Sequence, residues 1–460
     1  MYEDAKKSKK RGFVFLGIVV FGLAIFGISS LFSFILSDTI TAETQEQRFE
    51  RITAERNEFL ASLTREQILD DIDYMMYILE ENYPYLELLY RVRGVDMREH
   101  GRQLREKLED ETIELDLQTF WDIMQDYFFI HANATGHLFP IGRSVYINQL
   151  ANSSRYLSYP WNAWIVEAIT SDASKAFYGE ITDDDLDISM EIEPDPNNIT
   201  TEIIEEGRIG YIRVNRMLGT TQSEDLVILR PFYNEIADFE HLIIDIRGNP
   251  GGWPWYFYER ITAPHINNTI SLRYWYFLKG GELYMDFLER ATHRFQYEPS
   301  SFEIVDGQIM TGLVGDTFLN LGRGHLLLDE LKNFDYAVMH RETLAPFHSR
   351  WGLRNDFSGQ IWLLVDEMSA SASEHVAALY KRENLAVIVG ETTRGAIWNP
   401  GLRNLLFALP NTGLVIRFEI GYVIDRTGRS LAEGIPPHIF NRPGMDALET
   451  VLALIKEGAY

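Results

Sequence analysis

Cysteine is absent from the 460 residues of this sequence, which excludes three kinds of chemistry at once. Without thiols the chain forms neither disulfide bonds nor thiolate zinc sites, and it holds no cysteine nucleophile. Positive charge is also scarce, because 42 Lys and Arg residues stand against 68 Asp and Glu residues, for a formal net charge of −26. Such a surface repels phosphates, so we do not expect nucleic acid as a partner.

Several motifs of well-known chemistry are missing as well. The sequence has no GxxxxGK[ST] phosphate loop, no GxSxG elbow, no SxxK motif and no HExxH zinc motif. Nothing in it points to a metal ion or an organic cofactor, and nothing fixes the oligomeric state. Its hydrophobic fraction of 46% is that of an ordinary globular chain, so most of the sequence should fold.

One long uncharged run lies near the N-terminus. Residues 12–36 carry no charge and follow the basic stretch Lys6–Arg11. As a helix this run is roughly 37 Å long, enough to cross a hydrocarbon core of ~30 Å. The basic flank places residues 1–11 in the cytoplasm, so we interpret the run as a signal anchor in the cell membrane, with residues 38–460 outside the cytoplasm. The alternative, a cleaved signal peptide, leaves the main domain in the same compartment.

Four segments follow the anchor. Residues 37–63 are polar and rich in helix formers, as in a helical stalk, and residues 64–139 keep helical periodicity, as in a helical domain. Residues 140–206 include an acidic, proline-bearing stretch and are interpreted as a connecting segment. Residues 207–460 alternate short apolar runs with helix-like segments, which predicts an α/β core with an aromatic-rich insertion at about 265–360. At the start of the helical domain, Thr64 and Gln67 fit a capping box.

The stretch HLIIDIRGNPGG reads as a buried strand followed by a glycine turn. Its apolar run is typical of a strand covered on both faces. Gly251 and Gly252 let the backbone turn sharply and bring N–H groups close to a ligand, as in an oxyanion hole. The alternative is an ordinary turn after a strand.

Three serines alternate with alanines in VDEMSASASEHVAALY, between an apolar run and a helix-like segment. Ser371 would lie at a helix N-terminus, where free N–H groups and the helix dipole favour a developing oxyanion. The alternative is purely structural, because serine is a preferred N-cap and Ser371 fits a capping box with Glu374. A nucleophilic serine also needs a base.

In combination, HLIIDIRGNPGG, VDEMSASASE and LAVIVGETTRG closely resemble the tail-specific, or C-terminal processing, serine peptidase family. With GRIGYIRV before them and GIPPHI after them, the resemblance covers about residues 207–440. It implies a crotonase-like (ClpP/crotonase-type) α/β core after the helical domain and the single transmembrane helix. It also implies that Ser371 is the nucleophile, and that the N–H of Ala372 and one from Gly251 or Gly252 form the oxyanion hole. No PDZ segment is recognisable, so the resemblance is to the PDZ-less members.

The base of the lysine-dependent members is missing here. Their lysine follows the VGE-T-G segment, where this chain has Ala396, and Arg394 stays protonated and so is no base. The tricorn-like branch uses a histidine from the helical region instead, and TGHL, with His137, resembles its D-G-H-T segment. An imidazole has the right affinity for the serine proton near neutral pH. The alternatives are that His137 is an ordinary loop histidine, or that His131 is the base.

That branch also has a glutamate after the nucleophile. RTGRSLAEGIPPHI resembles the family ending E-G-x-G-I-P-P-D-I, but the position of its glutamate falls on Leu431. Glu433 is the nearest acid, and we expect it to orient the histidine through a shifted loop. The alternative is that Glu433 is a solvated surface residue.

Two functions remain. The first is a membrane-anchored serine peptidase that acts on peptides or proteins outside the cytoplasmic membrane. The second is a catalytically inactive protein of the same fold that binds a peptide or an apolar ligand. The missing lysine, the displaced acid and the aromatic-rich stretch 272–287 favour the second.

Overall fold

The computed structural model describes most of the chain after residue 43. The described residues are 44–153, 163–182, 185, 195, 197–218, 222–286, 302–306, 333–346, 357–396, 404–424 and 430–459. The chain divides into two compact units, residues 1–55 and residues 56–460, and the second unit contains both sides of the candidate site described below. The expected basic tail and membrane anchor, residues 1–36, lie outside the described residues, and none of the described helices is both long and apolar enough to span a bilayer.

The first part of the described chain is helical, as predicted. Thr64 and Gln67 form the expected capping box, in which the Gln67 N–H donates to Thr64 Oγ1 (3.2 Å) and the Thr64 N–H donates to Gln67 Oε1 (2.9 Å). The helices up to the histidine segment are α2 (Gln45–Ser62), α3 (Arg65–Asn82), α4 (Leu86–Arg93), α5 (Met97–Glu109), α6 (Leu117–Met124) and α7 (Ile130–Ala132), with the π-helical turn η1 (Gln125–Phe129) and the 3₁₀ turn η2 (Thr135–His137).

The segment 140–206 contains more regular structure than a connection requires. Its described residues form α8 (Arg143–Ala151), α10 (Ala163–Thr170), α11 (Asp172–Tyr178) and the strand β2 (Ile199–Glu205). In α10, four apolar side chains are buried: Trp164, Ile165, Ala168 and Ile169. The described parts of this segment therefore belong to the packed structure.

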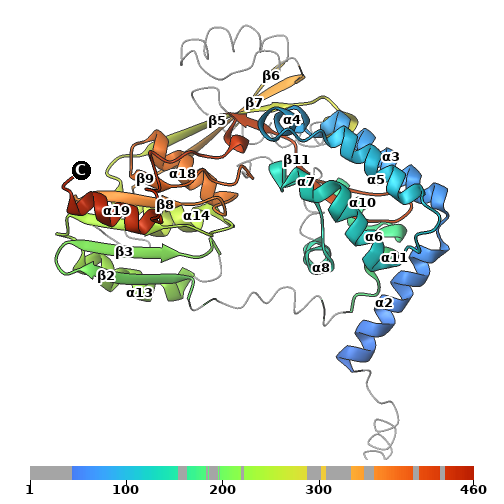
Figure 1. The fold of residues 1–460 in the computed structure, drawn as a ribbon, viewed down its shortest axis with the longest axis horizontal. Coiled ribbons are helices and arrows are strands. Elements are labelled where there is room, and N and C mark those ends of the chain that lie inside the picture. The colour runs from blue at the N-terminus through green and yellow to red at the C-terminus, as the bar shows by residue number, and fades with distance from the viewer. Residues whose placement is uncertain are drawn as a thin grey trace, which may run out of the picture. The chain divides into compact units, whose positions relative to one another are not determined.

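A three-stranded antiparallel sheet joins the helical part to a hairpin from late in the sequence. Its order is β1 (Phe139–Pro140), β11 (Val415–Glu419), β10 (Asn404–Ala408), and Figure 1 shows β11, in red, beside the teal helices. The turn between β10 and β11 is fastened to α3 by Asp71. This buried carboxylate accepts from the N–H groups of Asn411 (2.8 Å) and Thr412 (2.7 Å) and from the Thr412 hydroxyl (2.7 Å).

The α/β core is a six-stranded sheet in the order β13–β9–β8–β4–β3–β2. All neighbours pair in parallel except β2 with β3. Leu242 and Ile244 of β4 face a core shared with α13 and α18, whereas Ile243 faces α19. This double burial explains the continuous apolar runs in the sequence. The other elements of the core are β3 (Ile209–Val214), α13 (Gln222–Glu235), β4 (His241–Asp245), α14 (Pro254–Phe257), η4 (Tyr258–Thr262), η5 (Ala263–His265), β8 (Gln360–Val365), α18 (Ala372–Arg382), β9 (Val387–Gly390), β13 (Ile439–Phe440) and α19 (Ala447–Lys456).

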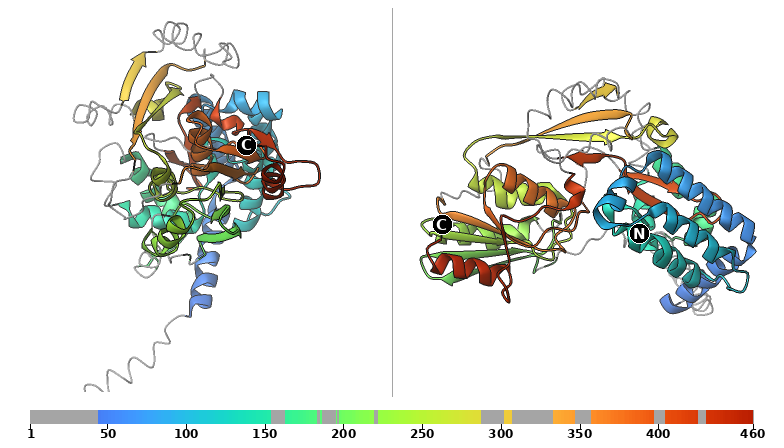
Figure 2. Two further views of the ribbon diagram at one scale, coloured as in Figure 1. Left: turned by 90° about the vertical axis from the view of Figure 1, so that its left-hand side faces the viewer. Right: turned by 45° about the horizontal axis from the view of Figure 1, so that its top comes forward.

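The aromatic-rich insertion contributes a sheet of its own. Its three strands, drawn in yellow to orange in Figure 2, are β5 (Ile270–Leu278), β6 (Phe302–Asp306) and β7 (Tyr336–Leu344), and β12 (Tyr422–Ile424) extends the sheet beyond β5. The 3₁₀ turn η7 (Leu431–Glu433) follows β12 in the chain. The whole is a mixed α/β fold with a helical N-terminal region.

Candidate active site

Ser371 is the N-cap of helix α18, in the connection that follows the parallel strand β8, and its own backbone is strained. Its φ of 57° and ψ of −118° are unfavourable for a residue with a side chain, and such strain is concentrated at functional sites. Its N–H donates to the Ala396 carbonyl (3.0 Å) and to Glu374 Oε2 (3.2 Å). Glu374 thus caps the backbone as a capping box requires, while the Ser371 hydroxyl faces His137.

The other two serines of the segment have structural roles. The hydroxyl of Ser369 donates to the Ile246 carbonyl (2.9 Å), and the hydroxyl of Ser373 donates to the Asn249 carbonyl (3.0 Å). Both side chains are buried and fasten the helix start to the turn after β4. Ser371 is therefore the serine of this segment whose hydroxyl is directed at a base.

The glycine turn after β4 lies directly against Ser371. Gly251 has a φ of 90°, and a Cβ there would lie 2.6 Å from the Ala372 nitrogen and 2.9 Å from Ser371 Cβ. Only glycine fits that approach. The turn and the start of α18 therefore form one wall around the Ser371 hydroxyl.

Two N–H groups of this wall suit an oxyanion. The Ala372 N–H is the first of α18, and helix geometry leaves it without an intrahelical acceptor. Gly252 forms a parallel β-bridge with Met217, in which the Met217 N–H donates to the Gly251 carbonyl (3.0 Å) and the Trp253 N–H donates to the Met217 carbonyl (2.6 Å). In such a bridge the N–H of the central residue points away from the partner strand, so the Gly252 N–H points away from Met217. The Gly251 N–H instead donates to Asn249 Oδ1 (2.8 Å) within the turn. Of the two glycines we named, the geometry favours Gly252 as the second donor.

His137 reaches Ser371 from a tight loop before β1. Its Nε2 lies 3.2 Å from Ser371 Oγ, and its side chain is 13% exposed. The loop bends sharply to place it there, since Asn133, Ala134, Gly136 and His137 all have positive φ. The structure thus brings together the serine and the histidine that the sequence suggested.

The alternative base, His131, is occupied elsewhere. Its Nε2 lies 3.0 Å from the Asp126 carbonyl, and its ring stacks on that of His100 with the centroids 3.7 Å apart. It does not approach the serine.

An acid that the sequence analysis missed lies behind the histidine. His137 Nδ1 is 3.3 Å from Oε1 of Glu419, whose side chain is fully buried. The register of β1 on β11 explains the match: Phe139 pairs with Arg417 and Pro140 with Ile416, so continuing the ladder by two residues sets His137 opposite Glu419. The contact is not yet aligned as a hydrogen bond, and such contacts between catalytic groups often tighten only around substrate.

The expected orienting acid, Glu433, does not occupy that position. It ends η7, and its Oε1 lies 3.0 Å from the Arg91 guanidinium of α4. Glu419 therefore replaces Glu433 as the acid beside the histidine. A signal for it existed in the sequence: Glu419 interrupts the apolar strand GLVIRFEIGYV, and a carboxylate inside such a strand needs a partner.

The loop that carries the catalytic lysine in the lysine-dependent members of the family stabilises the start of α18 here. Glu374, which is fully buried, accepts from the Thr393 hydroxyl (2.7 Å) and the Gly395 N–H (2.6 Å), and burial raises the pKa of its carboxyl to about 7. Arg394 donates from Nη2 to Asn133 Oδ1 (3.3 Å). The loop thus connects the start of α18 to the segment that bears His137.

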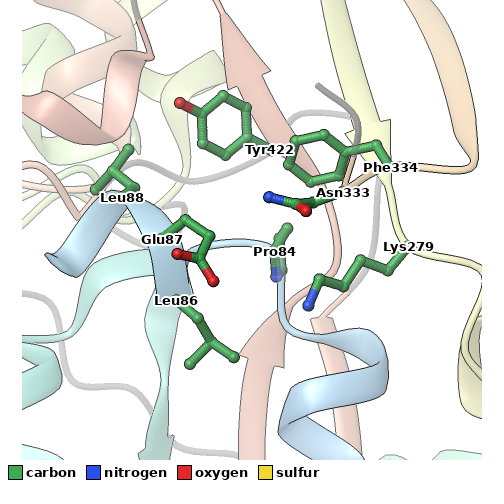
Figure 3. Close-up of a pocket in the computed structure, with 8 residues that line it drawn as sticks. All are labelled: Pro84, Leu86, Glu87, Leu88, Lys279, Asn333, Phe334 and Tyr422. Carbon is green, nitrogen blue, oxygen red and sulfur yellow. The ribbon is translucent and has the colours of Figure 1, made fainter. Parts of the chain in front are cut away.

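A separate small pocket lies beside α4 and is not part of this site. Figure 3 shows its lining, in which Phe334 and Tyr422 form an apolar side and Glu87 and Lys279 a charged one. It encloses about 10 Å³, room for about one water molecule, and neither Ser371 nor His137 lines it. Among the described residues, no group of three or more His, Asp or Glu side chains is placed to hold a metal ion.

A serine hydroxyl beside a histidine, with a buried acid beyond the imidazole, is the arrangement found in the active sites of serine hydrolases. Residues 208–440 match peptidase family S41, and the chain belongs to that family of tail-specific and C-terminal processing peptidases. It is a serine-type peptidase.

Several solved structures match this chain at low sequence identity. The chain is similar to a putative peptidase from Parabacteroides merdae ATCC 43184, with 16% identity over 84% of this chain and 95% of that one (TM-score 0.47). It is also similar to mature CPAF complexed with lactacystin, with 12% identity over 86% and 97% (TM-score 0.49). The photosystem II D1 C-terminal processing protease matches over 57% of this chain and 53% of its own, with 18% identity (TM-score 0.32).

Proposed function

We propose that the protein is a membrane-anchored serine peptidase that hydrolyses peptide bonds in extracytoplasmic peptides or proteins through Ser371, His137 and Glu419. One observation carries the mechanism: Ser371 Oγ lies 3.2 Å from His137 Nε2, while a buried carboxylate lies 3.3 Å from the other ring nitrogen. That arrangement gives the serine proton an acceptor and the resulting imidazolium a counter-charge.

Acylation begins when Ser371 Oγ attacks the scissile carbonyl carbon and its proton moves to His137 Nε2. The carbonyl oxygen becomes an oxyanion, and the N–H groups of Ala372 and Gly252 stabilise it. Glu419 stabilises the imidazolium without taking a proton. His137 then donates its proton to the leaving amine, the C–N bond breaks, and an acyl-serine remains.

Deacylation repeats these steps with water. His137 Nε2 takes a proton from the water as its oxygen attacks the acyl carbon, and the same N–H groups hold the second oxyanion. The C–O bond to Ser371 then breaks, and the serine recovers its proton from the imidazolium. One peptide bond and one water are consumed in each cycle.

The site also bears on the alternative function. A binding protein without catalysis was favoured by the missing lysine and the displaced acid. His137 supplies a base where the lysine is absent, and Glu419 supplies the acid. Both reasons for the binding alternative are thereby weakened.

The finer assignment of the fold is part of the same proposal. A crotonase-like core of the PDZ-less, tricorn-like branch is supported by the parallel strands β4 and β8, whose carboxyl ends carry the glycine turn and Ser371. The histidine base from the helical region supports the assignment to that branch. The outlines proposed for the other segments are a stalk at 37–63 and an insertion at about 265–360.

The location of the protein rests on the sequence of residues 1–36. The uncharged run 12–36 and its basic flank support a single-pass anchor with a cytoplasmic N-terminus and an extracytoplasmic main domain. Protease added to intact cells should digest the main domain while a cytoplasmic control protein survives. Survival of the main domain until the membrane is broken would reverse the orientation.

Labelling with a fluorophosphonate tests the chemistry on the full chain in detergent. Wild type should label covalently, Ser371→Ala should not label, and His137→Ala should label at least about 10³-fold more slowly, because the serine loses its base. Hydrolysis of an unfolded protein such as casein should follow the same order. Undiminished labelling of Ser371→Ala would assign the nucleophile elsewhere.

A further inference from the structure

The Glu419 carboxylate has a second neighbour that the mechanism above does not use. In the antiparallel pairing of β10 with β11, Asn404 lies directly opposite Glu419. Side chains at such paired positions lie on the same face of the sheet, within reach of each other. Glu419 is therefore flanked by His137 from the β1 side and by Asn404 from the β10 side.

The orientation of the Asn404 amide is set by its surroundings. Glu419 only accepts hydrogen bonds, and the guanidinium of Arg417, on the other side of the amide, only donates them. The amide satisfies both neighbours in one orientation, with Oδ1 toward Arg417 and Nδ2 toward Glu419. In that orientation Nδ2 faces both oxygens of the Glu419 carboxylate, with Oε2 at 3.0 Å, and Oδ1 accepts from the Arg417 guanidinium.

Arg417 is in turn held by the strand that follows the histidine. Its guanidinium carbon lies 5.3 Å from the centre of the Phe139 ring, and the two residues are paired in the ladder of β1 with β11. Arg417, Asn404 and Glu419 thus form a row of hydrogen bonds that all run in one direction: Arg417 donates to Asn404, and Asn404 donates to Glu419. Glu419 Oε1 thus lies between the histidine and the amide, whereas Oε2 has the amide as its partner.

We propose that Asn404 is the positioning residue of the catalytic acid: its amide holds the Glu419 carboxylate in the orientation that faces His137. This inference rests on the proposed function of Ser371, His137 and Glu419. Asn404 acts through Glu419 and makes no contact with the reacting atoms. A neutral donor suits the task because it fixes a carboxylate without cancelling the negative charge that stabilises the imidazolium.

Two replacements of about the same size as asparagine distinguish the effect of the hydrogen-bond donor of Asn404 from the effect of its side-chain shape. Asn404→Leu removes the donor, and kcat should fall about 10- to 100-fold with KM within about twofold, because a hydrogen bond to a buried charge is lost. Asn404→Asp replaces the donor by a second acceptor and adds a negative charge beside Glu419. The acid limb of the pH profile of kcat/KM should then move to higher pH by about half a unit or more, because a second carboxylate favours the protonated imidazole.

The other charges around the imidazole are the same in all these variants. They are Glu419 and Arg417 on β11, Glu374 at the start of α18, and Arg394 in the loop that contacts Asn133. A shift of the acid limb in Asn404→Asp is therefore caused by the one added carboxylate. A merely structural asparagine would change the amount of folded protein, while kcat per folded molecule in Asn404→Leu would stay at the wild-type value.

Glu419→Gln and Ser371→Ala are run beside these variants on the full chain, with thermal unfolding as the check on folding. If Glu419→Gln loses activity while Asn404→Leu keeps kcat within twofold of wild type, the inference about Asn404 is overturned and the proposed function stands. An unmoved acid limb in Asn404→Asp overturns it as well. If Glu419→Gln and Ser371→Ala both remain fully active, the proposed function itself fails. Asn404→Gln, which keeps an amide, should recover part of the activity that Asn404→Leu loses.

Discussion

The two halves of the active site are built in different ways. The nucleophile half, made of the turn after β4 and the start of α18, comes from adjacent parallel strands and is held by short loops. The base half joins a loop near residue 137 to a hairpin near residue 419, and its geometry depends on the pairing of β1 with β11. The residues of the nucleophile half lie in short contiguous sequence motifs, whereas the base half forms only when two distant segments of the chain pair as β1 and β11.

The sharpest way to test the base half is to compare the two histidines that the sequence offered. His137→Ala should lower kcat/KM by about 10³- to 10⁶-fold, because the serine loses its proton acceptor. His131→Ala should stay within about threefold of wild type, since its ring stacks on His100 away from the serine. Steady-state kinetics on a quenched peptide substrate measure both. Equal losses in the two variants would contradict the assignment.

The two glutamates give the next largest contrast. Glu419→Gln keeps the shape of the side chain but removes its charge, and kcat should drop by about 10³-fold, as for the loss of an acid that orients the histidine. Glu433→Gln should change kcat by less than about threefold, because Glu433 forms its ion pair with Arg91. A loss of kcat in Glu433→Gln alone would contradict this assignment and would favour Glu433, the acid expected from the sequence.

A pair of glycines tests the nucleophile half. Gly251→Ala sets a Cβ 2.6 Å from the Ala372 nitrogen, so the turn must move and the oxyanion donors with it. We expect kcat to fall about 10²- to 10³-fold, the cost of losing one such donor. Gly248→Ala is the matched control: it has a similar positive φ of 72°, but the nearest atom to its Cβ is 4.0 Å away. Both variants carry the backbone strain, so the difference in kcat between them isolates the crowding at Ser371.

This contrast explains which parts of the structure could be predicted. The apolar runs of β4 and β8 and the helical periodicity of α3 depend on neighbours in the sequence, and the mixed α/β fold with a helical N-terminal region followed from them. Ser371 and the glycine turn were found by motifs for the same reason. Glu419 was missed because its place in an apolar strand signals only that it needs a partner, whereas the identity of that partner depends on a register between strands almost three hundred residues apart in the chain. Glu433 was chosen because it is the acid nearest to a recognisable motif, and proximity in sequence is a poor guide to such pairing.

The smallest expected effect concerns stability, at the buried acid that braces the nucleophile half. Burial raises the pKa of Glu374 to about 7 from the 4.5 of an exposed glutamate, so the folded protein holds this proton over a range of pH in which the unfolded chain releases it. The folded state therefore binds more protons between about pH 4.5 and 7. The free energy of unfolding should fall across this window as the pH rises, by about 3 kcal/mol from this group.

Glu374→Gln tests this dependence, because its amide does not titrate. Chemical unfolding at pH 5, 6, 7 and 8 should show a decline in wild type that the variant lacks, with Glu433→Gln as a control that keeps the wild-type slope. Since Glu374 accepts from the Gly395 N–H, the variant should also lose some stability at every pH. Parallel curves for wild type and Glu374→Gln would mean that the carboxyl does not change its proton affinity on folding. Glu374 would then be an ordinary ionised acceptor of hydrogen bonds. The two halves of the site would differ only in how far apart in the sequence their residues lie.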